Sequence, residues 1–183
     1  MRFPEFITKK DLKSRCFEEH ALIYDTSTNA PTSRDFGTIN MSELSPFRIY
    51  YGIPVPGQNG VYSDTVEGIW QGLKIVKGKT DFSYFKGKGR KRNAKPKGHL
   101  YGSKILNIVQ ARELIYIPSY QFMWENRIDQ KLRDLFVTRS SNDLPQYFLD
   151  VDTNFDIHNK ERPFAHSALV VNLIKQDLER LFQ

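Results

Sequence analysis

Apolar side chains recur at helical spacing in two segments of the chain, and this pattern is the strongest constraint on its fold. In the first segment, Asp64 precedes a repeat formed by Val66, Ile69, Trp70, Leu73 and Val76. In the second, residues 164–181 carry the stripe Leu169, Val170, Leu173, Ile174, Leu178 and Leu181. Each stripe covers one side of a helix, and that side has to be buried. The chain is therefore expected to fold around an apolar core to which these helices contribute.

Shorter patterns predict the remaining elements. Thr8 can cap a short first helix, and apolar runs at residues 21–24 and 147–151 are typical of buried strands. Alternation of period two over residues 45–56 indicates another strand, which Pro54 and Pro56 confine to a sheet edge or end. Further helices are expected over residues 105–116, stopped near Pro118, and over residues 120–138. Three short strands among about five helices predict an α+β, helix-dominated domain with a small sheet.

The length of 183 residues suits one domain. We expect a single domain over residues 1–183, with an N-terminal extension over residues 1–40 and a long loop over residues 25–46. Cys16 is the one cysteine, so an intrachain disulfide is excluded and a reducing, cytoplasmic location is expected. No apolar run reaches about 18 residues, so no membrane association is expected. The histidines lack metal-ligand spacing, so neither a metal nor a cofactor is expected, and the pattern leaves the oligomeric state open.

The positive charge is confined to one stretch, which we call the basic stretch: residues 86–104. It holds 8 of the 27 lysines and arginines and no acidic residue. The rest of the chain holds 19 basic and 21 acidic residues. Its basic residues are Lys86, Lys88, Arg90, Lys91, Arg92, Lys95, Lys97 and Lys104. Interspersed glycines predict a loop rather than a helix, and flanking aromatics suit phosphate groups and stacked bases. A solvated flexible loop is the alternative interpretation.

The helix beginning near Asp64 carries a polar strip along one flank. Glu67, Trp70, Gln71 and Lys74 are spaced i, i+3, i+4 and i+7 and therefore share that flank. A carboxylate, an indole, an amide and an ammonium group together suit the binding of a nucleotide. The structural alternative is a capping box, because Glu67 follows Asp64 by three residues. Two helical glycines, Gly68 and Gly72, each cost about 1 kcal/mol relative to alanine, which predicts the close approach of a backbone or a ligand.

The same residues carry a resemblance to a known family. Ser45-Pro46-Phe47, followed by Thr65-Val66-Glu67 and then by Gln71 and Lys74, resembles the opening signature of the NADAR (YbiA-like) superfamily. The longer segment Val66–Lys74 is also similar to a bacterial and phage family that carries the sequence VEGIWQGLK. A weaker resemblance continues through residues 120–138 and through Asp152, Asn154 and His166. In total it covers roughly residues 42–182, and the helix of Glu67 is its specific part.

The resemblance implies a NADAR-like fold and the cleavage of N-glycosidic bonds in ADP-ribosylated guanine or in a ribosylated pyrimidine. It places Glu67 and Trp70 in the catalytic pocket. This chain departs from the family pattern in having Gly68 after the glutamate, and in having Asp150–Asn154 where the family has a W-G-x-G element. These departures leave the substrate undetermined and make loss of activity one of the outcomes to be tested.

We therefore expect an N-glycosidase-type hydrolase in which Glu67 stabilises a ribosyl cation or takes a proton from water. Asp152 is the candidate for a second catalytic carboxylate, with a solvated acidic turn as the alternative. The candidate substrate-binding residues are Ser45, Phe47, Trp70, Gln71, Lys74, Lys88, Arg90, Arg92, Asn154 and His166. The expected ligand is ADP-ribose or a related nucleotide, with nucleic acid as a further candidate.

Two other functions remain open. The first is a binding module that holds a nucleotide or nucleic acid in a NADAR-like pocket without cleaving it, which the missing C-terminal element favours. The second is an interaction protein whose basic stretch contacts an acidic partner, which rests on charge alone.

Overall fold

A computed structural model describes residues 1–27 and 37–182 of the chain. Part of the loop expected over residues 25–46 therefore lies outside the described residues. The chain divides into two compact units. We call the first the sheet unit, formed by Met1–Ser45, Ile128–Phe155 and Arg162–Gln183, and the second the helix unit, formed by Pro46–Arg127 and Asp156–Glu161. The expectation of one domain over residues 1–183 stays a prediction, and each unit is described by itself.

The sheet unit is built on a parallel sheet with the strand order β1-β8-β2-β3. The strands are β1 (Glu5–Ile7), β2 (Leu22–Asp25), β3 (Ile39–Asn40) and β8 (Gln146–Leu149). All four residues of β8 are buried, as expected for an inner parallel strand with both faces covered. The C-terminal part of the chain thus supplies an inner strand between two strands from its N-terminal part.

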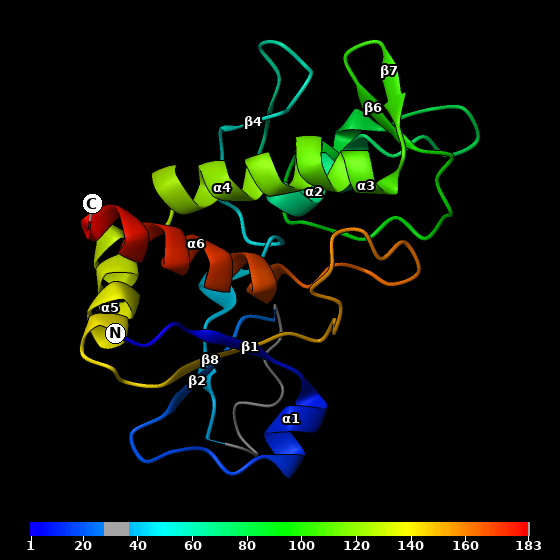
Figure 1. Cartoon of the computed structure of the whole chain (residues 1–183). Helices are drawn as coiled ribbons and strands as arrows, with labels where there is room; N and C mark the ends of the chain where they lie inside the picture. The colour runs from blue at the N-terminus through cyan, green and yellow to red at the C-terminus, as the bar shows by residue number, and fades with distance from the viewer. Residues whose placement is uncertain (28–36, 183) are drawn as a thin grey trace. The chain divides into compact units, whose positions relative to one another are not determined.

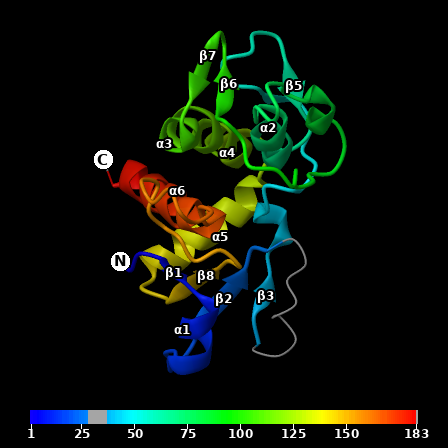
Figure 2. The same ribbon diagram turned by 90° about the vertical axis from the view of Figure 1, so that its right-hand side faces the viewer.

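Helices cover the two faces of this sheet (Figures 1 and 2). On one face, α1 (Lys9–Ser14) contributes Leu12 to an apolar cluster with Ile7, Tyr147 and Leu149. On the other lie α5 (Gln130–Ser141) and α6 (His166–Leu181). The rings of Tyr24, Phe136 and Phe148 pack there with centroids 5.0–5.2 Å apart. Alternate residues of β8 therefore enter different layers of apolar side chains.

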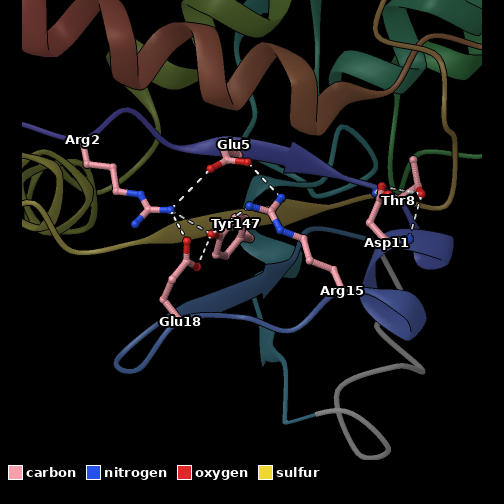
Figure 3. A network of polar contacts seen from close by, with 7 residues as sticks. All are labelled: Arg2, Glu5, Thr8, Asp11, Arg15, Glu18 and Tyr147. Carbon is pink, nitrogen blue, oxygen red and sulfur yellow. Dashed lines mark hydrogen bonds and ion pairs between the residues drawn. The ribbon is translucent and has the colours of Figure 1, made fainter.

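A network of polar side chains lies on the face of the sheet that α1 covers (Figure 3). The hydroxyl of Tyr147 donates to Glu18 Oε2 at 2.5 Å and accepts from Arg2 at 3.0 Å and from Arg15 at 3.2 Å. Arg2 also binds Glu18 Oε1 at 2.6 Å, and Arg15 binds Glu5 at 2.9 Å. Hydrogen bonds from Arg2 and Tyr147 lower the pKa of Glu18 to about 2. Burial and the Glu18 carboxylate raise the pKa of Tyr147 to about 12.

The helix unit combines two short hairpins with a group of helices. The hairpins pair β4 (Ile53–Pro54) with β5 (Tyr62–Ser63) and β6 (His99–Tyr101) with β7 (Lys104–Leu106). The helices are α2 (Val66–Gly72), η3 (Phe82–Phe85), α3 (Ile108–Ala111), the π-helix η4 (Arg112–Tyr116) and α4 (Ile117–Asn126). Their fully buried side chains include Ile69, Leu73, Ile115, Tyr120 and Trp124. Arg112 fixes residues 156–161 to this unit by donating to the carbonyls of Ile157 and Asn159, each at 2.6 Å.

Several predicted elements are confirmed. The fold is α+β, Thr8 caps α1 in a capping box with Asp11, and the strands expected at 21–24 and 147–151 are β2 and β8. The closing helix runs over His166–Leu181. Lys86–Gly98 contains no helix or strand, as expected for the basic stretch, although β6 and β7 occupy its far end.

The strand predicted over residues 45–56 is mostly wrong, because only Ile53–Pro54 is a strand. Tyr51 and Gly52 adopt left-handed conformations, with φ of 52° and 61°, which interrupt an extended chain. The amides of Tyr50 and Tyr51 instead donate to the carbonyl of Asp64, and Arg127 binds the carbonyls of Tyr51 and Gly52. The alternating apolar side chains thus belong to an irregular segment held by local hydrogen bonds.

The helix boundaries predicted around Pro118 are also wrong. Pro118 does not stop the helix: the chain remains helical from α3 through η4 into α4, and a π-helical turn lies just before Pro118. The helix expected over residues 120–138 is instead divided at residues 127–129. Asp129 caps α5 there by accepting from the amide of Lys131 at 2.9 Å. A local cap therefore outweighs the continuous apolar pattern.

Replacement of Tyr147 by phenylalanine should lower the free energy of unfolding by about 1 kcal/mol, because the ring remains packed while three hydrogen bonds of its hydroxyl are lost. Tyr24→Phe is the matched control, since the buried Tyr24 hydroxyl has no hydrogen-bond partner among the described residues. Urea denaturation measures both. Equal losses in the two variants would contradict a stabilising role for the network.

Candidate functional site

Three of the four residues of the predicted polar strip, Glu67, Trp70 and Gln71, lie on α2 of the helix unit. The prediction is wrong for Lys74, because α2 ends at Gly72 and Lys74 instead forms a bridge with His99.

Thr65 caps α2 by accepting from the amide of Gly68 at 2.8 Å, and the amide of Glu67 donates to the carbonyl of Pro46 at 2.9 Å. Asp64 accepts instead from the amide of Gly87 at 2.7 Å. Thr65 and not Asp64 is the N-cap of α2, so the capping box considered for Asp64 and Glu67 is wrong.

The two glycines of α2 admit close packing by η3. A Cβ atom at Gly68 would lie 2.5 Å from the carbonyl oxygen of Tyr84, and one at Gly72 would collide with the ring of Phe85. The predicted close approach is thus made by a backbone and an aromatic ring of the chain itself. These glycines bring the start of the basic stretch against α2.

Glu67 and Gln71 form the centre of the candidate site. The amide nitrogen of Gln71 donates to Glu67 Oε1 at 2.5 Å, and both side chains are buried, with Glu67 only 6% exposed. The amide oxygen of Gln71 accepts from the backbone N–H of Arg92 at 3.2 Å. Gln71 therefore connects a buried carboxylate to the basic stretch.

Lys74 and Arg92 place positive charge beside this pair. The guanidinium of Arg92 donates to the carbonyl of Lys74 at 3.0 Å. Burial lowers the pKa of Lys74, the positive charges of Lys91 and Arg92 lower it further, and attraction to Glu67 opposes the shift. Lys74 and Arg92 thus bring positive charge to the segment that follows α2, an arrangement that favours an anionic ligand.

Trp70 lies between two aromatic neighbours. Its ring centroid is 4.0 Å from that of His99, with an angle of 32° between the planes, and 5.5 Å from that of Tyr116, with an angle of 71°. His99 comes from β6 and Tyr116 from the end of the π-helix η4. The predicted stacking residue therefore already belongs to an aromatic group of the chain and is only partly buried.

His99 is a site residue that the sequence analysis considered only as a metal ligand. It is 1% exposed, and burial, followed by the charge of Lys74, lowers its pKa to about 3, so it is neutral at physiological pH. Its backbone forms a bridge with Lys74. No pattern in the sequence pointed to it, because its place beside Trp70 depends on the bridge between β6 and Lys74.

The basic stretch packs against Glu67 through its backbone. The amide of Gly89 donates to the carbonyl of Phe47 at 3.1 Å, and a Cβ atom at Gly89 would lie 3.0 Å from Glu67 Cβ. Arg90 lies over the ring of Tyr84, with its guanidinium carbon 4.5 Å from the ring centroid, and Lys88 is exposed. Phe47 and Arg92 are thus brought to the Glu67 strip, whereas Arg90 lies against Tyr84. The chain near Gly89 packs against the Cβ of Glu67.

The other predicted site residues belong to the sheet unit. Ser45 is buried after η2 (Ser42–Leu44), and Asn154 donates to the carbonyl of Arg162 at 3.2 Å. The amide of Asp152 donates to Asp150 Oδ1 at 3.3 Å. These contacts fix the chain between β8 and α6, and a role of Asp152 or Asn154 in catalysis or binding stays a prediction.

His166 forms a buried ion pair at the carboxyl ends of the strands. Its Nδ1 lies 2.8 Å from Asp150 Oδ2, and its Nε2 lies 3.1 Å from the carbonyl oxygen of Thr26. Burial alone would lower the pKa of His166, but the Asp150 carboxylate outweighs it and the pKa is raised. With both nitrogens donating, the imidazolium links the end of β2 to the start of α6.

No group of three or more histidine, cysteine, aspartate or glutamate side chains suited to a metal ion occurs within residues 1–27 and 37–182. Over the same residues, no helix has both the length and the apolar character needed to cross a membrane.

Replacing Gly89 by alanine should detach the basic stretch from α2. The new Cβ atom would lie 2.8 Å from the backbone Cα of Phe47, and a backbone atom cannot move aside as a flexible side chain can. We expect trypsin to cleave the variant several-fold faster between Lys86 and Lys97, because cleavage follows the population of the open segment. Asn93→Ala, at an exposed position of the same stretch, is the control. Unchanged cleavage of the glycine variant would exclude close packing at Gly89.

His166→Gln should destabilise the chain more in mild acid than in mild base. Because the folded-state pKa of His166 is raised above 6.5, its stabilisation is complete below pH 6.5 and is lost as pH rises through the folded-state pKa. The readout is the difference in unfolding free energy between wild type and variant at about pH 5.5 and about pH 8.5. The lowered pKa of His99 weakens folding in acid in both proteins. Subtracting the variant from the wild type at each pH therefore cancels the contribution of His99. His20→Gln, at an exposed site, should show no such trend.

Comparison with curated proteins and with solved structures found no match. A family model does match, and it covers residues 8–170, which include the α2 strip, the basic stretch and the Asp150–His166 pair. The chain therefore belongs to the family described as "Family of unknown function (DUF6939)".

Proposed function

We propose that the α2 site is the catalytic centre of an N-glycosidase-type hydrolase acting on ADP-ribose-containing or ribosylated nucleobase substrates. The observation that carries this proposal is the buried carboxylate of Glu67, which accepts a hydrogen bond from Gln71 and attracts the charge of Lys74. The resemblance of the same residues to the NADAR superfamily supports it, and we propose a NADAR-like fold on that basis.

Glu67 has the chemistry that the reaction needs. Cleavage of an N-glycosidic bond passes through a ribosyl cation, which a nearby carboxylate stabilises. The same carboxylate can take a proton from the attacking water, while the departing base takes up the electron pair of the broken C–N bond and a proton. Gln71 positions this carboxylate by a direct hydrogen bond. The charge of Lys74 attracts this carboxylate.

The cations of the basic stretch would hold the phosphate groups of the substrate. Arg92 is half-buried beside Lys74, and Arg90 is oriented by its contact with Tyr84. Guanidinium groups bind phosphate oxygens through paired hydrogen bonds. The exposed lysines beyond them, such as Lys88, exceed what one pyrophosphate requires, so ADP-ribosylated nucleic acid is included among the proposed substrates.

Glu67 is covered, with 6% of it exposed, and the chain near Gly89 packs against its Cβ, so the covering chain has to move for a substrate to reach the carboxylate. This coverage is the specific observation that favours the second candidate function, a module that binds a nucleotide or nucleic acid without cleaving it. In that function the cations and aromatic groups bind the ligand, and the Glu67–Gln71 pair serves to hold the basic stretch in place.

Glu67→Gln decides between these functions. We expect the variant to fold as the wild type does and to release base from NAD, or from ADP-ribosylated DNA, at least about 100-fold more slowly, because it lacks the ionised carboxylate. Released base is measured by chromatography. Glu113→Gln, at an exposed position of the same unit, is the control and should keep full activity.

Two results contradict the hydrolase. Binding of these substrates by the wild type without any release of base would establish the binding module instead. Equal rates of release in the wild type and in Glu67→Gln would remove Glu67 from the mechanism.

A further inference from the structure

His99 is buried at a cost in free energy that its packing does not offset. Among the described residues, neither of its ring nitrogens has a hydrogen-bond partner, although the residue is 1% exposed. A buried polar group without a partner loses its hydration and gains nothing in return, which destabilises a fold. A phenylalanine at this position would pack without that cost. The imidazole is therefore expected to serve a purpose other than core packing.

The position of His99 relates it to the α2 site. Its ring lies nearly parallel to that of Trp70, with centroids 4.0 Å apart, and Trp70 shares its helix flank with Glu67 and Gln71. The β6 strand that carries His99 is joined to the end of this flank, since the amide of Leu100 donates to the carbonyl of Leu73 at 2.9 Å. His99 is thus held rigidly against the indole.

The protonation state of His99 defines what it can recognise. A neutral imidazole offers one donor and one acceptor, whereas an imidazolium offers two donors. The edge of a nucleobase carries hydrogen-bond donors and acceptors side by side on a flat ring. Phosphate and ribose lack such an edge. A buried, neutral imidazole beside an indole therefore suits a heterocyclic base better than an anion.

We propose that His99 is a specificity-determining residue of the α2 site, which hydrogen-bonds the edge of the heterocyclic base of a nucleotide. This inference rests on the proposed function for the location of the site, but it concerns recognition of the base and not the cleavage step. It requires a shift of the covering chain or of the Trp70 ring for the base to reach the imidazole. It assigns the base to His99 and the phosphate groups to the basic stretch.

The test compares ligands that differ only in the base. The four ribonucleoside 5′-monophosphates and ribose 5-phosphate are titrated against wild type, His99→Phe and the control His158→Phe, which changes an exposed histidine of the same unit. We expect the wild type to bind at least one nucleotide about tenfold more tightly than ribose 5-phosphate, and His99→Phe to lose this preference. Affinity for ribose 5-phosphate should be unchanged in both variants.

A second measurement does not depend on any variant. Nitrogen-15 NMR of the wild type resolves its four histidines, and the preferred nucleotide should shift the ring signals of His99 but not those of His20 or His158. Equal affinity of the wild type for nucleotides and ribose 5-phosphate overturns the inference, as does an unshifted His99 signal at saturation. A parallel loss of affinity for all ligands in His99→Phe overturns it too. None of these results affects the test of hydrolysis by Glu67→Gln.

Discussion

The side-chain amide of Gln71 is the interaction on which the candidate site depends. It donates to the Glu67 carboxylate and accepts from the backbone N–H of Arg92. One residue therefore holds both the acid and the basic stretch at Arg92. The amide is suited to this role because it has a donor and an acceptor, and burial strengthens both bonds. Without this amide, the Glu67 carboxylate, which is 6% exposed, would be buried with one hydrogen bond fewer to offset its lost hydration. The basic stretch would also lose its hydrogen bond to Gln71, near the end of α2.

The sequence predicts this site well where the relevant residues lie on one helix. The spacing of Glu67, Trp70 and Gln71 places them on one flank of α2 because α-helix geometry is regular. Lys74, in contrast, lies beyond the end of the helix at Gly72, in a bridge with His99. His99 could not be found in this way, since its place beside Trp70 depends on the pairing of β6 with a segment 25 residues earlier, at Lys74. Contacts between segments distant in the sequence leave no periodic signal. The same reason explains why the short strand β1 was not predicted.

The errors in secondary structure have local physical causes. At residues 45–56 the apolar alternation is real, but two left-handed residues and the hydrogen bonds of Asp64 and Arg127 keep the chain irregular. At Pro118 the usual stop signal fails, because the chain enters α4 directly from the π-helix η4 and stays helical through the proline. The pairing of His166 with Asp150 and Thr26, at the carboxyl ends of parallel strands, likewise left no signal in the sequence, and a role of His166 in binding stays a prediction.

The charges around Lys74 explain why the helix unit should favour a phosphorylated ligand. Lys74 is half-buried, and the positive charges of Lys91 and Arg92 act on it with one buried acid, Glu67, in opposition. An anion bound among these groups would reduce their mutual repulsion, and the low local dielectric would strengthen that attraction relative to the one in water. The half-buried Arg92 cannot withdraw easily, since its guanidinium donates to the carbonyl of Lys74. The repulsion is therefore built into the folded chain, and a bound phosphate is the simplest group that would relieve it.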